Sequence, residues 1–302
     1  MKFLNYSKQN KISCGILSGT DRILDLKNVL HFLGKDIAMG DSDTHFFNNY
    51  FALKSLIDEF LTKSPKEIQT IPLSEVKILA PILNPFKIIC LGLNYRDHAA
   101  ESGEKLPKLP MLFAKAPTAI IGVDDEIKIP KVRKKINGSS IPINFLDYEV
   151  ELAIIIGKKC YRTSKEDAKE YILGYTILND VSARIEQMAD KQFFRSKSFD
   201  TFAPLGPWIV TSDEIGDPMN LKIDCKVNGQ IMQNSNTQNM NFNVYEIISF
   251  ISEAITLLPG DIIGTGTPAG VGAGKNPPQS LKSGDLVELT IENIGSLRNR
   301  VQ

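Results

Sequence analysis

Polar and apolar residues alternate over residues 146–152, and a wholly apolar run over 153–156 follows directly. Strict alternation predicts a strand, on which successive side chains point to opposite faces. Glu149 and Glu151 therefore lie on one face together with Asp147, with the two glutamate Cα atoms roughly 7 Å apart. The apolar run predicts that the same strand continues into the hydrophobic core.

Short strands outnumber helices in the rest of the pattern. Alternation or brief apolar runs predict strands over residues 2–6, 12–17, 76–80, 87–92, 110–115, 175–180, 221–227 and 262–263. Helical spacing predicts helices over residues 50–62, 164–172, 181–187 and 244–257. Asn228-Gly229 predicts a hairpin, residues 203–208 a tight buried turn, and residues 101–109 a mobile loop able to close over a site.

The pattern divides the chain into two parts. Residues 1–75 predict a small leading unit, and residues 76–302 predict a larger domain. The larger part carries a basic segment within residues 131–144. We interpret this segment as a solvated hairpin or loop insertion, with a contact for an anionic partner as the alternative.

Composition and charge remove several classes of function. Of 302 residues, 42% are hydrophobic and 23% are charged, and 35 basic side chains balance 35 acidic ones. This balance gives no net field for nucleic acid or a membrane surface, and no apolar run is long enough to span a bilayer. The four cysteines lie far apart and the first residues lack a secretory signal. We therefore expect a cytoplasmic protein without disulfides or a zinc site.

Glu149 and Glu151 raise the first chemical question, because like charges on one face repel each other. A cation between them removes this cost, and carboxylate oxygens suit hard divalent ions such as Mg²⁺, Mn²⁺ or Ca²⁺. The alternative is an edge strand whose acidic face is simply wet, and the pattern alone leaves both open. Asp180 ends the predicted strand over 175–180, a place where ligands often bind.

Other polar residues are candidates for the same site. His98 and Glu101 are three residues apart on a predicted helix, which places both on one face. A carboxylate that orients a histidine makes it a general base, although a solvent-facing polar pair has the same spacing. Arg184 and Gln187 follow at helical spacing in a later helix, and the amides of the glycine-rich loop 264–272 can approach an oxyanion.

Five motifs in this order resemble the fumarylacetoacetate hydrolase family over roughly residues 80–302. They are Gly92-Leu93-Asn94-Tyr95 with His98 and Glu101, Asp147-Tyr148-Glu149-Val150-Glu151-Leu152, Asn179-Asp180-Val181-Ser182-Ala183-Arg184, Lys197-Ser198-Phe199-Asp200-Thr201, and Gly264-Thr265-Gly266-Thr267-Pro268-Ala269-Gly270-Val271-Gly272. The resemblance implies an α+β fold, in which a mixed, barrel-like β-roll with flanking helices follows a small N-terminal α+β domain. It also implies a homodimer.

The resemblance further implies roles for individual residues. Glu149, Glu151 and Asp180 are implied to bind a divalent metal, with Mg²⁺ the first expectation and Mn²⁺ the second. His98 and Glu101 are implied to activate water. The substrate oxygens are implied to be surrounded by Lys197, Arg184, Gln187, Thr265 and Gly266. Lys197 counts among the catalytic residues because its charge lies near the developing oxyanion.

The chemistry shared by the family implies the function. A metal chelates the carboxylate and keto oxygens of a 2-oxo acid and stabilises the enolate formed when a carbon–carbon bond breaks or a proton leaves. We therefore expect a metal-dependent hydrolase that cleaves a small 1,3-diketo acid of the acylpyruvate or fumarylpyruvate type. The alternatives are a decarboxylase of the oxaloacetate type, a keto–enol isomerase of the 2-hydroxyhepta-2,4-diene-1,7-dioate type, and a non-catalytic metal-binding protein.

Overall fold

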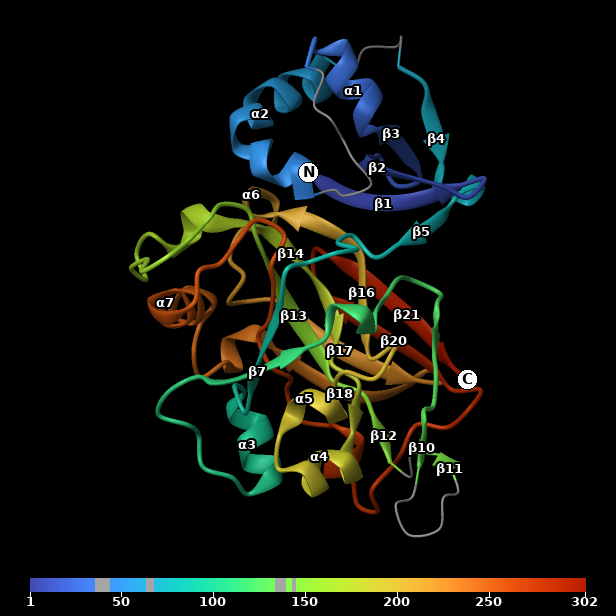
Figure 1. Cartoon of the computed structure of the whole chain (residues 1–302), viewed down its shortest axis with the longest axis vertical. Helices are drawn as coiled ribbons and strands as arrows, with labels where there is room; N and C mark the ends of the chain where they lie inside the picture. Colours follow the sequence, from blue (N-terminus) through green and yellow to red (C-terminus); the bar gives the residue numbers. More distant parts are fainter. Residues whose placement is uncertain (36–43, 64–67, 134–139, 143–144) are drawn as a thin grey trace.

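A computed structural model describes residues 1–35, 44–63, 68–133, 140–142 and 145–302. Within them, most strands pair in one mixed sheet that continues from the top of Figure 1 into its lower half. Its order is β4 (Thr70–Pro72), β3 (Arg22–Asp25), β2 (Lys11–Ser18), β1 (Lys2–Lys8), β16 (Ala203–Thr211), β14 (Ile172–Asn179), β13 (Val150–Ile156), β19 (Ile262–Gly264), β6 (Ile88–Gly92) and β7 (Met111–Lys115). Two short strands lie off this path, β5 (Lys77–Leu79) against β1 and β8 (Ile120–Ile121) against β16.

A second sheet packs against the middle of the first. Its order is β18 (Gln230–Asn236), β17 (Lys222–Val227), β20 (Leu286–Ile291), β21 (Gly295–Val301) and β9 (Glu126–Ile127). Strands β17 and β20 contact β13, and β21 contacts β16. Among the described strands neither sheet closes on itself, so the β-roll is a pair of open sheets rather than a barrel. The expected α+β fold is confirmed in this form.

Helices flank the sheets, and α2 (Thr44–Lys63) is the longest of those described. They are α1 (Leu26–Phe32), α2, α3 (Arg96–Ser102), α4 (Arg184–Asp190), α5 (Phe193–Ser196), α6 (Ser212–Ile215) and α7 (Val244–Ala254). Helix α7 begins with a capping box in which the Asn243 side chain accepts from the Glu246 amide and the Glu246 side chain accepts from the Asn243 amide. No helix in the described residues combines the length and the apolar character needed to span a membrane.

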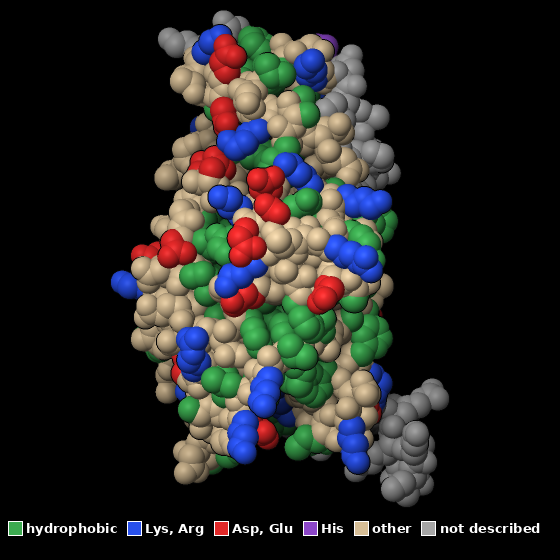
Figure 2. Space-filling model, turned by 90° about the vertical axis from the view of Figure 1, so that its left-hand side faces the viewer, with side chains coloured by type: hydrophobic (Ala, Val, Ile, Leu, Met, Phe, Trp, Pro, Cys, Tyr) green, Lys and Arg blue, Asp and Glu red, His purple; other side chains and the backbone are tan. Residues whose placement is uncertain are grey.

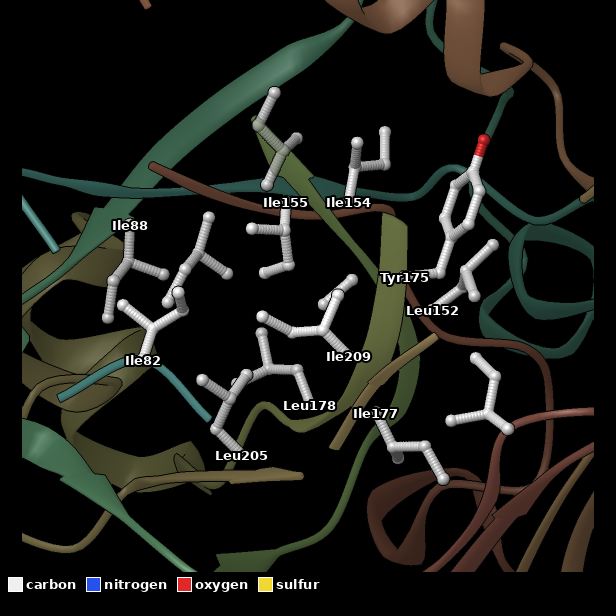
Figure 3. Close-up of a cluster of buried hydrophobic side chains, with 14 of the residues drawn as sticks. Ile82, Ile88, Leu152, Ile154, Ile155, Tyr175, Ile177, Leu178, Leu205 and Ile209 are labelled. Atoms are coloured by element: carbon white, nitrogen blue, oxygen red, sulfur yellow. The ribbon is translucent and has the colours of Figure 1, made fainter. Parts of the chain in front are cut away.

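The main core lies where the two sheets meet around β13 and β14. Every residue of β13 is buried, as its apolar run predicts. Figure 3 shows how aliphatic side chains from these strands fill the space together with those of neighbouring elements, among them Ile154, Ile177, Leu205 and Ile209. This packing holds the strand ends that carry the acidic residues in a fixed register.

The first strands continue the sheet of the larger part. Strand β1 pairs with β16, so that Phe3 lies opposite Ile209. Phe3 also packs its ring against an aromatic group from α2, with ring centroids 5.2 Å from Phe46 and 5.5 Å from Tyr50. The division into residues 1–75 and 76–302 stays a prediction, although the two parts share one sheet.

The helix predicted over residues 164–172 is wrong. The Ser164 hydroxyl accepts from the Asp167 amide at 3.1 Å and closes a turn, and only a 3₁₀ segment, Ala168–Tyr171, follows. Ile172 already begins β14, because pairing with β13 buries its apolar residues. Tertiary packing here outweighs helix propensity.

Residues 203–208 form a strand and not the predicted turn. They begin β16, which pairs with β14 so that Leu205 lies opposite Leu178 and Gly206 opposite Ile177. The register shifts between Tyr175 and Ile177, where residues 207–209 of β16 lie against Thr176 alone, so the extra residues are in β16. The prolines and the glycine of this segment suggest a turn, but other strands pair with it on both sides and hold it extended.

The basic segment forms a small hairpin where it is described. Strands β10 (Lys131–Arg133) and β11 (Ser140–Pro142) pair antiparallel, and residues 134–139 and 143–144 lie outside the described chain. A further short pair joins β12 (Leu146–Asp147) to β15 (Ser182–Ala183). This second pair ties the start of the acidic segment to the start of α4.

Figure 2 shows the face on which α3 and α7 lie in Figure 1. Acidic and basic side chains alternate over much of its upper half, whereas apolar side chains gather lower down. The segment that follows α3 contributes exposed apolar residues to the surface, and Leu106 is 38% and Leu109 65% exposed. Gly103 ends α3 in the left-handed conformation. That the loop over 101–109 closes over a site stays a prediction.

Candidate metal and active site

Strand pairing brings the three predicted acidic ligands together. Val150 of β13 lies opposite Asn179 of β14, so Glu149 and Glu151 flank the position from which Asp180 leaves its strand. One carboxylate oxygen from each of the three lies within 4.8 Å of the others. All three residues are buried, with exposed fractions between 0% and 6%. Their grouping fits the wet-edge alternative poorly, since the acids face the interior.

Glu151 has no side-chain partner among the described residues, although the backbone amide of Gly266 lies near enough to lower its pKa. Both of its carboxylate oxygens are buried without a hydrogen bond. The backbone of β19 closes over it so tightly that a Cβ atom on Gly264 would lie 2.3 Å from Oε2. Burial, with the charges of Asp180 and Glu149, raises the pKa of Glu151 well above its ordinary value. A buried carboxylate of this kind is costly, and a cation bound beside it would remove the cost.

Glu149 is held by two cations from the other side. Arg184 donates from Nη1 to its Oε1 at 2.7 Å and from Nε to Asp147 Oδ2 at 2.9 Å. Lys197 Nζ lies 3.0 Å from its Oε2. Although burial opposes ionisation, the charges of Lys197 and Arg184 lower the pKa of Glu149. The ionised form of Glu149 is therefore fixed by the protein itself.

The Lys197 ammonium lies between two of the three acids. It is 2.5 Å from Asp180 Oδ2 as well as 3.0 Å from Glu149 Oε2. Burial alone would lower the pKa of Lys197, but Asp180 and Glu149 outweigh it and raise that pKa. The ring of Phe113 covers another side of the ammonium, with 5.0 Å between Nζ and the ring centroid. Lys197 thus stands in for part of the positive charge that a metal ion brings.

A second buried lysine, Lys115 at the end of β7, was not predicted. Its Nζ lies 2.6 Å from Asp180 Oδ1 and also donates to the backbone carbonyl oxygens of Lys197 and Val181. The side chain is 0% exposed. The apolar run before it gives no sign that the lysine points inward, since a strand that ends in lysine usually leaves the core there.

The composition of the cluster fits a divalent cation. Asp147, Glu149, Glu151 and Asp180 supply four carboxylates, against the three cations Lys115, Arg184 and Lys197. The carboxylates therefore exceed the cations by one, and Glu151 is the carboxylate without a cation beside it. A divalent ion would leave the pocket with one net positive charge, which suits an anionic substrate. Oxygen-only donors suit Mg²⁺ or Mn²⁺.

His98 and Glu101 lie on α3, as their spacing predicts. His98 Nδ1 is 3.4 Å from Glu101 Oε2, and the charge of His98 also lowers the pKa of Glu149. Both oxygens of Glu101 accept from the Gly270 amide, at 2.9 and 3.0 Å. Burial raises the pKa of Glu101, but the hydrogen bonds from His98 and Gly270 bring it below its ordinary value. The glycine-rich loop therefore fixes the carboxylate that faces the histidine.

The remaining predicted residues surround the acids in different ways. Gln187 Oε1 accepts from Arg184 at 3.1 Å. Thr265 is fully buried, and its hydroxyl donates to the Leu152 carbonyl, which ties β19 to β13. Gly266 has a φ of +90°, and its amide lowers the pKa of the nearby glutamate, Glu151. Direct contact of these residues with a substrate stays a prediction.

Asp147 is a further residue whose importance the sequence only hinted at. Its Oδ1 accepts from the Gly272 amide at 2.7 Å, and its Oδ2 accepts from the Ala273 amide at 2.9 Å and from Arg184. One buried carboxylate thus joins the end of the glycine-rich loop to the arginine that holds Glu149. The available signal was its parity, which it shares with both glutamates.

Fold and site together define an α+β protein with a buried, oxygen-lined pocket suited to a divalent cation. A model of the family described as "Fumarylacetoacetate (FAA) hydrolase C-terminal" matches residues 87–302. The chain belongs to the fumarylacetoacetate hydrolase family, as its motifs predicted.

Three known proteins illustrate the likeness. The oxaloacetate tautomerase YisK of Bacillus subtilis is 40% identical over 100% of both chains. A fumarylacetoacetate hydrolase from Exiguobacterium antarcticum is 35% identical, with a TM-score of 0.80 over 100% of this chain and 99% of that one. A maleylpyruvate hydrolase from Sphingobium sp. SYK-6, solved with manganese(II) and pyruvate, is 29% identical, with a TM-score of 0.77 over 100% and 98%. These relatives are enzymes that act on small organic acids.

Proposed function

We propose that this protein is a metal-dependent keto–enol tautomerase of a short 2-oxo dicarboxylic acid of the oxaloacetate class. The observation that carries the proposal is the buried acid cluster with its unpartnered Glu151 and its wall of cations. Such a pocket takes a divalent ion together with an anionic ligand. The likeness to an oxaloacetate tautomerase over the whole of both chains supports that substrate class.

Glu149, Glu151 and Asp180 would hold the ion, Mg²⁺ or Mn²⁺. When bound, the ion supplies positive charge that makes the carbon next to a keto group more acidic. Glu149 is kept ionised by its neighbours, and Glu151 is kept free of other partners. The acid cluster therefore destabilises the fold as long as no cation is bound to it.

Arg184 and Lys197 bind and orient the substrate. Arg184 Nη2 is buried and has no partner among the described residues, so it can donate to a substrate carboxylate. Lys197 lies between Glu149 and Asp180 and adds charge beside the oxygen on which the enolate forms. Both side chains are fixed by carboxylates before a substrate arrives, which lowers the cost of orienting it.

The proton transfer is assigned to His98. Its ring takes the proton from the methylene carbon next to the keto group and returns a proton to the enolate oxygen, so the balance of atoms is unchanged. Glu101 is ionised because its pKa is lowered, and it stabilises the protonated ring. The single N–H of Gly270, shared by both oxygens of Glu101, keeps this carboxylate aimed at the ring during the transfer.

Hydrolysis of a carbon–carbon bond is the second candidate, and it was the leading expectation from the sequence. The same His98–Glu101 pair can activate water, and the pyruvate-bound maleylpyruvate hydrolase supports this reading. Two further alternatives remain, namely decarboxylation at the same site and metal binding without catalysis. The homodimer and the small-molecule partner stay part of the proposal.

One panel of substrates separates these reactions. Freshly dissolved oxaloacetate and a set of acylpyruvates are incubated with the protein and Mg²⁺, Mn²⁺ or a chelator. A tautomerase accelerates the decay of the oxaloacetate enol absorbance without releasing CO₂ or a second acid. Two acids from an acylpyruvate would indicate the hydrolase, and CO₂ the decarboxylase. Enol decay no faster than in buffer, with and without metal, would contradict the tautomerase.

A further inference from the structure

Each of two acids in the cluster has one oxygen bound by a cation that lies outside the cluster. Arg184 holds Oε1 of Glu149 at 2.7 Å, and Lys115 holds Oδ1 of Asp180 at 2.6 Å. The second oxygen of each acid faces the Lys197 ammonium. Only Glu151 has both oxygens free. Arg184 and Lys115 therefore determine how many oxygens Glu149 and Asp180 can provide to a metal ion.

Lys115 is fixed in this position by its surroundings. All three ammonium hydrogens have acceptors, namely Asp180 Oδ1 and the carbonyl oxygens of Val181 and Lys197. The side chain is 0% exposed, so water does not compete for Asp180. Separating a buried pair of this kind leaves both charges without compensation, which means that a bound ion does not readily pull Oδ1 away.

We infer that Lys115 is a positioning residue that keeps Asp180 a one-oxygen ligand and so selects small six-coordinate ions over Ca²⁺. The inference rests on the proposed metal site. Ca²⁺ takes six to eight oxygens and often binds a carboxylate through both of its oxygens, whereas Mg²⁺ demands octahedral geometry. With Oδ1 held by Lys115, Asp180 cannot supply the extra oxygen that favours the larger ion.

The test compares the affinities of two ions rather than one. Removal of Lys115 takes away a positive charge, which changes the affinities for Mg²⁺ and Ca²⁺ in the same direction because both ions carry two charges. Their ratio cancels this effect and reports the coordination. We expect Lys115→Met to shift the ratio toward Ca²⁺ by about tenfold or more, the size typical of changes to groups that orient metal ligands.

The chain offers a matched control in Lys87. This lysine pairs with the fully buried Asp261, far from the acid cluster in sequence and outside its contacts. MgCl₂ and CaCl₂ are titrated separately by calorimetry into the wild type, Lys115→Met and Lys87→Met. Lys87→Met should keep the wild-type ratio. A ratio for Lys115→Met within about twofold of the wild type overturns the inference, since a purely structural lysine would leave selectivity unchanged.

Two further outcomes have definite meanings. If the wild type binds neither ion, the proposed function and this inference both fall, whereas an unchanged ratio in a metal-binding protein overturns the inference alone. If Lys115→Met does not fold, a crystal structure of the wild type with Mn²⁺ decides. Asp180 bound through one oxygen, with Lys115 on the other, supports the inference, and Asp180 bound through both oxygens overturns it.

Discussion

The acid cluster and the aromatic group around Phe3 are both buried next to one sheet, but burial has opposite effects on stability in the two regions. Phe3 contacts Phe46, Phe47 and Tyr50, whose burial releases apolar surface from water. The acid cluster buries charge, and one of its members, Glu151, has no partner. Burial thus stabilises the first region, while in the second it prepares a binding site at the expense of stability.

The sharpest way to separate the two regions is Glu151→Gln. We expect turnover to fall about a thousandfold, because several kcal/mol of transition-state stabilisation are lost with the ion. In the presence of a chelator the same variant should be more stable than the wild type by about 1 kcal/mol, since a buried acid group that is crowded by Asp180 and Glu149 and has no side-chain partner has gone. Steady-state kinetics and urea unfolding measure the two effects. A metal-free variant less stable than the wild type would contradict the argument.

Phe3→Ala should give the reverse pattern. We expect the free energy of unfolding to fall by about 3–5 kcal/mol, because a ring with several aromatic neighbours leaves a cavity. Turnover per folded molecule should stay at the wild-type level, since Phe3 touches none of the predicted site residues. Urea unfolding and kinetics below the transition provide the measurements, with Phe3→Leu as the conservative control. A selective loss of turnover would show that the regions are coupled.

His98→Gln tests the chemistry without touching the acids. The His98 side chain contacts Glu101 and is only 16% exposed, so glutamine is chosen because it keeps a polar side chain at this position. We expect turnover to fall about a hundredfold or more, as for a lost general base. Calorimetry should show unchanged Mg²⁺ binding. Turnover equal to that of the wild type would show that His98 does not take part in the reaction.

The smallest expected effect is a dependence of stability on pH through Glu101. Its pKa is lowered in the folded state, so its contribution is fully present above the ordinary value of 4.5 and is lost as the pH falls through the lowered value. Glu101→Gln lacks this contribution. The difference in melting temperature between wild type and variant should therefore shrink as the pH is lowered from 7 toward 3. A constant difference would contradict the assignment.

The pattern predicted β13 with Glu151, because alternation followed by an apolar run is a local property, but it missed the break that leaves Glu149 between β12 and β13. It also placed Asp180 at the end of the next long strand. It could not supply the register, in which Val150 faces Asn179 and the three acids meet. That register depends on packing between segments far apart in the chain, and only the family resemblance suggested the grouping in advance.

Lys115 shows why part of the site escaped prediction. A buried lysine is recognised by the acceptors around it, and here these come from residues 180, 181 and 197, which are distant in sequence. Residues 203–208 show the complementary error, since their prolines indicate a turn while β14 and β8 on either side make them a strand. Both failures arise where neighbours in space outweigh neighbours in sequence.

The pairing of Phe3 with Ile209 has a consequence for the chain as it is made. On the ribosome, β1 emerges roughly two hundred residues before β16, which pairs with Lys2 and Phe3, whereas β5 covers residues 5–7 of the same strand much sooner. Until β16 is made, the unpaired start of β1 can pair with another nascent chain, because its free backbone groups form hydrogen bonds with any available strand. A product truncated before residue 203 would keep the start of β1 unpaired permanently, and it should collect in aggregates rather than accumulate as a stable fragment.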